Sequence, residues 1–169
     1  MNLQYITGRM AVNVDAIQSL LRGVADEQAC WKPAPRKWSI LEVINHLYDE
    51  ERLDFRPRVD STLHNPGKAW PLFDPKALVI ERNYNERDFA QSIDEFLGER
   101  QKSLDWLGGL SSPDWSLSYE HPTIGELRAG DLLAAWLAHD LLHICQLARL
   151  HVDYSSFLLK PYHVGYAEP

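Results

Sequence analysis

The sequence predicts an all-α protein, a four-helix bundle with a long crossover between the second and third helices and an aromatic C-terminal tail. Three observations support this fold class. Apolar residues recur at spacings of three and four in four separate stretches. Residues 61–84 lack this periodicity and carry several prolines, and aromatic residues gather after the last periodic stretch. The length of 169 residues suits a single domain over residues 1–169.

The first helix is expected over residues 3–23. Ile6, Met10 and Ile17 recur at helical spacings and define its apolar face. Asn13 is assigned to the polar side of this helix. A loop with two prolines then leads to the second helix.

The second helix is expected over residues 39–55. Ser39 and Glu42 have the spacing of a capping box, in which each residue bonds the backbone N–H of the other. Pro57 should break or kink this helix, because proline lacks a donor and its ring clashes with the preceding turn. Trp38, just before the helix, is expected to cover one end of the bundle.

The crossover is expected over residues 61–84, with short helical turns allowed within it. Connections this long are more often functional than structural, and this one would let the third helix run parallel to the second. The third helix is expected over residues 86–107, ended by Gly108. Its charged residues, Glu99 and Arg100 among them, are expected to face solvent.

The fourth helix is expected to begin between Thr123 and Gly130 and to run to Leu150. An extended segment over residues 115–121 and a short loop precede it. The C-terminal tail, residues 154–169, should pack on the bundle through its aromatic side chains. These aromatic residues are Tyr154, Phe157, Tyr162 and Tyr166.

The net charge of −7 and the absence of a basic run argue against nucleic-acid binding and against attachment to an anionic membrane. No apolar run has the length of a membrane span, and the N-terminus lacks the pattern of a signal peptide. A cytoplasmic protein is therefore expected, with Cys30 and Cys145 as reduced thiols. Cys145 is interpreted as a small buried residue that faces away from the nearby histidines.

Two histidines in the fourth helix suggest a metal site. His139 and His143 are four residues apart, so both imidazoles lie on one helix face, one turn apart. His46, in the apolar stripe of the second helix, is the best candidate for a third ligand. The alternative is a set of core histidines that form hydrogen bonds to backbone or acidic groups.

Four further residues are candidates for the site. Glu50, one turn after His46, is the first candidate for a catalytic base or for a partner that orients His46. Gln146 shares the face of the histidine pair and could bond a ligand or a substrate. Trp136 and Tyr48 are candidates for the substrate pocket, although aromatic residues at helical spacing are also typical of a core.

Two segments resemble the DinB/YfiT-like superfamily. Residues 38–51 read W-S-I-x-E-x-x-x-H-L-x-D-x-E, and residues 136–147 contain H-D-x-x-H-x-x-Q. The resemblance covers nearly the whole chain and implies a four-helix bundle, often dimeric, that binds a divalent metal. Carried onto this sequence, the metal ligands are His46, His139 and His143. Relatives of this kind include thiol transferases that use bacillithiol or mycothiol and a mycothiol-dependent isomerase.

The hypothesis that follows is a metal-dependent enzyme with an open three-histidine site that activates a thiol or water. It would be a thiol S-transferase or a hydrolase acting on a small molecule, with a low-molecular-weight thiol as one substrate option. Zinc or nickel is the expected metal, with iron or manganese as alternatives. Two other hypotheses remain open: a non-catalytic bundle that binds a metal or ligand, and a structural or regulatory bundle without a metal.

Overall fold

The computed structural model describes residues 1–167. Within them, helices predominate and one short hairpin is present. The α-helices are α1 (Leu3–Leu21), α2 (Asp26–Cys30), α3 (Ile40–Asp49), α4 (Arg56–His64), α5 (Pro75–Glu81), α6 (Phe89–Gly109) and α7 (Ala129–Leu158). The remaining elements are the π-helix η1 (Glu50–Phe55), the 3-10 helices η2 (Tyr84–Glu86) and η3 (Gly165–Ala167), and the strands β1 (Ser118–His121) and β2 (Gly125–Arg128).

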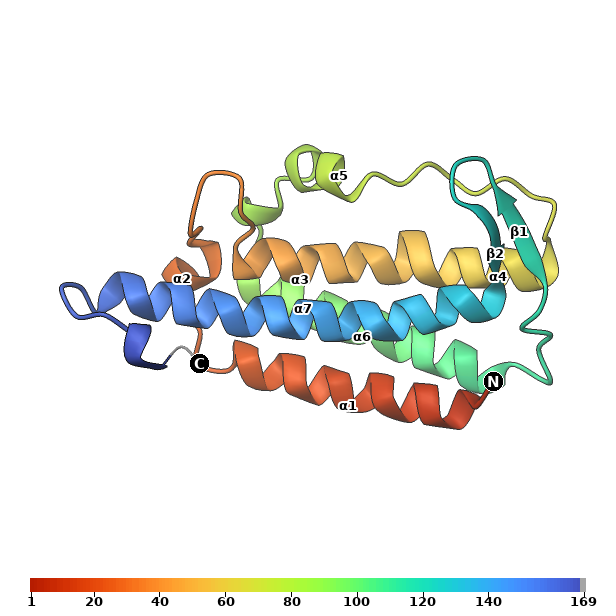
Figure 1. Cartoon of the computed structure of the whole chain (residues 1–169), viewed down its shortest axis with the longest axis horizontal. Coiled ribbons are helices and arrows are strands. Elements are labelled where there is room, and N and C mark those ends of the chain that lie inside the picture. The colour runs from red at the N-terminus through yellow and green to blue at the C-terminus, as the bar shows by residue number, and fades with distance from the viewer. Residues whose placement is uncertain (168–169) are drawn as a thin grey trace.

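Four long helical rods form the bundle: α1, the continuous rod α3–η1–α4, α6 and α7 (Figure 1). The first rod packs against α7, and α3 packs against α6. The segment between α4 and α6 returns along the length of the bundle, so that α6 runs in the same direction as α3 (Figure 1). No helix in residues 1–167 combines the length and the apolar character that a membrane span requires.

Side-chain caps fix where three of these rods begin. Asn2 accepts a hydrogen bond from the backbone N–H of Tyr5, and Asp88 accepts one from that of Gln91. Ser39 and Glu42 form the capping box that their spacing predicts, with each side chain bonding the other residue's backbone N–H. Such caps satisfy the first backbone donors of a helix, which have no partner within it.

Of the break or kink expected at Pro57, the break is wrong. The second rod passes through this residue and ends at His64. It does so because residues 50–55 form a π-helix directly before Pro57. A π-helical turn is wider than an α-helical one and lacks the regular hydrogen bond from the N–H of residue i to the carbonyl of residue i−4. Proline, which has no N–H and carries a bulky ring, is therefore accommodated after it.

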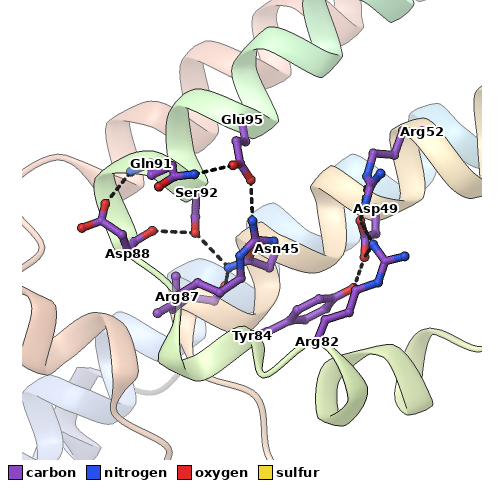
Figure 2. Close-up of polar contacts among 11 residues, drawn as sticks. Asn45, Asp49, Arg52, Arg82, Tyr84, Arg87, Asp88, Gln91, Ser92 and Glu95 are labelled. Carbon is purple, nitrogen blue, oxygen red and sulfur yellow. Dashed lines mark hydrogen bonds and ion pairs between the residues drawn. The ribbon is translucent and has the colours of Figure 1, made fainter.

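A buried carboxylate anchors the connection between α4 and α6 to the bundle. Asp49 is fully buried on α3 and accepts hydrogen bonds from Arg82, at 2.8 and 2.9 Å, and from the Tyr84 hydroxyl (Figure 2). Arg52, on the next turn, also donates to it at 2.9 Å. The two charged partners balance the desolvation of the carboxylate and hold α5 and η2 over the outer side of α3.

The later elements differ from expectation in extent. The extended segment is strand β1, which pairs with β2 in an antiparallel hairpin, so part of the expected loop is a strand. Helix α7 continues to Leu158, two turns beyond the expected end. Tyr154 and Phe157 therefore belong to α7, where both pack on Trp31.

Two aromatic residues of the expected tail do not pack on the bundle. Tyr162 is 77% exposed and Tyr166 is fully exposed. The last two residues of that segment lie outside the described part of the chain.

The interior consists of two apolar clusters separated by a buried polar layer. One cluster includes Ile17, Leu47, Phe96 and Leu147, and the other includes Met10, Val59, Leu107 and Leu133. Along each of the four rods, buried polar side chains lie between the residues of the two clusters. These polar side chains include Asn13, His46, Glu50, Glu51, Arg100, Asp140 and His143.

Candidate metal centre

Three imidazoles converge at the level of the polar layer. Within α3, His46 is held on the buried face by the apolar stripe around it, and His139 and His143 lie one turn apart on α7. The Nε2 atom of His139 lies 3.3 Å from that of His46 and 3.1 Å from that of His143. Each residue offers one nitrogen, and these three atoms all lie within 4.8 Å of one another.

The outer nitrogens of two rings indicate where their protons lie. The Nδ1 atom of His143 is 2.8 Å from Gln146 Oε1, which can only accept, so His143 Nδ1 carries the hydrogen. The Nδ1 atom of His46 faces Glu50 Oε1 at 3.5 Å. With hydrogens on these outer nitrogens, the Nε2 atoms of His46 and His143 both present lone pairs to the centre.

The three histidines are neutral. Burial lowers the pKa of His46 to about 2, helped by the proximity of His143 and His139. Burial likewise lowers the pKa of His139 to about 3, with further contributions from His143 and from Arg100. The pKa of His143 is also lowered, mainly by burial. Neutral imidazole is the protonation state in which histidine binds metals.

This donor set fits a metal ion. Two inward lone pairs face a third ring whose Nε2 can carry only one hydrogen. A single hydrogen cannot bridge both contacts in a normal geometry, so the cluster concentrates lone pairs in a buried space. A cation that accepts all three nitrogens removes this conflict, and imidazole nitrogen suits zinc, nickel, copper and iron.

Glu50 is buried beside His46, and its surroundings keep it protonated. Burial raises its pKa to about 9, and the charge of Asp54 and the hydrogen bond with Asp54 act in the same direction. Asp54 is paired with Arg58 at 2.7 Å, which favours the ionised state for Asp54 rather than for Glu50. Burial and Asp54 thus both favour the protonated form of Glu50, which lies where it can orient the ring of His46.

Two aromatic rings enclose the histidines. The Trp38 ring centroid lies 4.8 Å from that of His46, and the ring lies nearly parallel to His143 at 6.4 Å. Phe55 meets His139 edge to face at 5.2 Å. Trp38 was expected only to cover the end of the bundle, although its place one residue before the N-cap Ser39 puts it near the start of the helix that carries His46.

The other two pocket candidates, Trp136 and Tyr48, differ in their surroundings. Trp136 has a core position instead of a pocket wall, because its ring stacks on Phe55 and is 1% exposed. Tyr48 is half-buried on α3, with the Arg52 guanidinium 4.6 Å from its ring centroid.

Cys145 is exposed, so its assignment as a buried residue is wrong. It does face away from the site, as its position in the helix predicts.

A buried ionic network lies directly beside the histidines. Arg100, 1% exposed, bonds both carboxylate oxygens of Asp140 at 2.6 and 2.7 Å and Glu51 Oε1 at 2.6 and 2.9 Å. The Trp136 indole N–H donates to the same Glu51 oxygen at 2.7 Å. Burial lowers the pKa of Arg100, but the charges of both carboxylates outweigh burial and leave this pKa above its ordinary value.

The expectation that Arg100 and Asn13 face solvent is therefore wrong. Asn13 donates to Asp140 at 3.3 Å and is 1% exposed. Glu99 is also buried, where it accepts from Arg56 and Lys102. Together these contacts join all four rods at the level of the site. Since Asp140 directly follows His139, the network also fixes the part of α7 that carries the histidine pair.

Comparisons with known proteins agree with this fold. A family model described as the DinB superfamily matches residues 11–147. Among solved structures, the chain is similar to YfiT from Bacillus subtilis, described as a probable metal-dependent hydrolase with an unusual four-helix bundle topology. The TM-score is 0.79 at 16% sequence identity, covering 90% of this chain and 87% of YfiT. A search of curated proteins finds no match.

Proposed function

The chain belongs to the DinB superfamily, and on this premise we propose that it is an enzyme dependent on a divalent metal held by His46, His139 and His143. The convergence of three neutral imidazole nitrogens, from the buried His46 and His143 and the half-buried His139, is the observation that carries the proposal. The description of YfiT as a probable metal-dependent hydrolase supports the same reading.

The donor set favours a catalytic site over a structural one. Structural zinc sites commonly have four protein ligands, whereas catalytic sites commonly have three and leave a position open. A bound divalent metal would lower the pKa of a water molecule or a thiol. The deprotonated form, which is the nucleophile, would then be available near neutral pH. We propose water or a small thiol as that nucleophile, and zinc or nickel as the metal.

The surrounding residues have distinct roles in this proposal. Gln146 holds the hydrogen of His143 on Nδ1 and so keeps the Nε2 lone pair directed inward. Glu50, whose Oε1 lies 3.5 Å from His46 Nδ1, would hold the ring of His46 in place. Trp38 and Phe55 cover the histidines with apolar surface and limit the access of bulk water.

Elemental analysis followed by turnover assays tests the proposal. Purified protein incubated with zinc or nickel should hold about one ion per chain, and His46→Ala should lose it. Metal-loaded protein is then assayed for hydrolysis of a 4-nitrophenyl ester and for conjugation of monobromobimane to a small thiol. Turnover that disappears with a chelator and in His46→Ala is the expected result.

The control for the elemental analysis is His163→Ala, which removes an exposed histidine and should keep the metal. Wild-type protein without metal under these conditions would contradict the proposal. Metal binding without turnover of either probe would favour the non-catalytic metal-binding bundle.

Gln146→Ala is expected to weaken metal binding by about 10- to 100-fold, the usual cost of losing a residue that orients a ligand. Without the Gln146 acceptor, the His143 hydrogen can move to Nε2 and block the lone pair. Competition with a chromophoric zinc chelator measures the affinity. Gln101→Ala is the matched control, since the Gln101 side chain bonds Asp105 on the exposed side of α6. Equal affinities for the two variants would contradict this role for Gln146.

A further inference from the structure

A hollow beside the candidate metal centre concentrates positive charge. It has a volume of about 400 Å³ and lies between the loop before α3 and the segment α5–η2. Its lining includes Lys32, Arg36, Lys37 and Lys76, together with Trp38. We call it the basic hollow. Four cations around one hollow are unexpected in a chain whose net charge is −7.

Most of this positive charge is not neutralised within the protein. Two acidic residues, Glu42 and Glu86, also line the hollow. Glu42 is occupied, because it pairs with Lys32 at 2.5 Å and accepts the backbone N–H of Ser39. Within residues 1–167, the other three cations form no ion pair at 4 Å or less. The basic hollow therefore has an excess of cations over acids that faces solvent.

The walls of the basic hollow are fixed by hydrogen bonds. Asn85, which lines it, accepts from the Ser39 hydroxyl at 2.5 Å and donates to the Cys30 carbonyl at 3.0 Å. These two bonds tie η2 to both ends of the loop that carries Arg36 and Lys37. Cations on a fixed loop lose less conformational entropy on binding a ligand than cations on a free one.

Trp38 connects the basic hollow to the histidines. It lines the hollow, and its ring also contacts the rings of His46 and His143. Lys37 and Trp38 also line a second hollow of about 400 Å³ on the α7 side, to which Gln146 contributes as well. A small molecule in the basic hollow thus contacts the same indole ring that covers the proposed metal ligands.

We propose that the substrate is a small anion whose carboxylate or phosphate group binds Arg36, Lys37 and Lys76 in the basic hollow, with Trp38 between this group and the metal centre. The link to catalysis rests on the proposed function, whereas the anion binding does not. The compact ammonium groups of two lysines suit either anion, since they bind as point charges without a required geometry.

Calorimetric titration at low ionic strength tests the proposal with succinate, inorganic phosphate and the neutral analogue succinamide. Succinate or phosphate should bind, and succinamide should bind at least about tenfold more weakly. Whichever anion binds more tightly identifies the recognised group. Added salt should weaken the binding, because the cations are exposed.

The decisive variant is Lys37→Glu with Lys76→Glu, which should weaken anion binding by about tenfold or more. The matched control is Arg9→Glu with Lys68→Glu, which changes the net charge equally at exposed positions outside the hollow. Unchanged anion binding in the control is expected. Equal weakening in both variants, tight binding of succinamide, or no anion binding by the wild type would overturn the proposal.

Elemental analysis of the same variants separates this proposal from the proposed function. The Lys37→Glu, Lys76→Glu protein should keep its metal, because neither residue contacts a histidine of the site. If the protein binds anions through these lysines but holds no metal, the anion site is supported and the proposed enzymatic function is contradicted. If the protein holds its metal and is active but binds no anion selectively, the proposed function is supported and the anion site is contradicted.

Discussion

Replacing Arg100 with methionine is expected to lower the free energy of unfolding by about 3–5 kcal/mol, the usual effect of removing one partner of a buried ion pair. The side chain is 1% exposed and bonds two carboxylates, Asp140 and Glu51, that have almost no access to water. Without Arg100, both must be protonated or remain buried and unpaired. Urea denaturation followed by circular dichroism measures the change.

Arg87→Met is the matched control for this experiment. Arg87 also pairs with a carboxylate, Glu95, but the two side chains are 28% and 27% exposed, so its loss should cost about 1 kcal/mol or less. Adding Glu51→Gln and Asp140→Asn to Arg100→Met should recover part of the stability, because the remaining polar groups are then neutral. Equal losses for the two arginine variants would show that Arg100 has no special structural role.

The Arg100 network also shows why the buried polar layer was not predicted. Periodicity identifies a helix face by its apolar residues, so a polar residue is assigned to solvent by default. Yet Arg100 follows Phe96 by four residues and precedes Leu107 by seven, and Asn13 lies between Met10 and Ile17 at the same kind of spacing. Both residues therefore lie in line with apolar residues on the buried face of their helix. This spacing could have predicted that their side chains are buried.

The histidine cluster was predictable for the opposite reason. His139 and His143 share one face by their spacing alone, and His46 falls within an apolar stripe. What the sequence could not supply is the state of Glu50. Its pKa is raised first by burial and then by Asp54, and both depend on the π-helix in which Glu50 and Asp54 lie. Local sequence patterns do not report such a change of helical pitch.

Zinc or nickel is expected to raise the melting temperature of the metal-free protein by about 5–10 °C. Metal at a hundredfold excess over its dissociation constant stabilises the folded state by about 2.7 kcal/mol, if it does not bind the unfolded chain. For a protein of this size each kcal/mol corresponds to about 2–4 °C. Differential scanning fluorimetry of chelator-treated protein, with and without added metal, measures the shift.

The same measurement on His139→Ala identifies the site that causes the shift. Its Nε2 atom is the one in contact with both other histidines, so this variant removes the middle ligand of the cluster. The shift should therefore disappear in His139→Ala and persist in His163→Ala. Magnesium, which prefers oxygen ligands, should produce no comparable shift in the wild type. A zinc shift that survives in His139→Ala would mean that the metal binds elsewhere and that the three histidines are core residues.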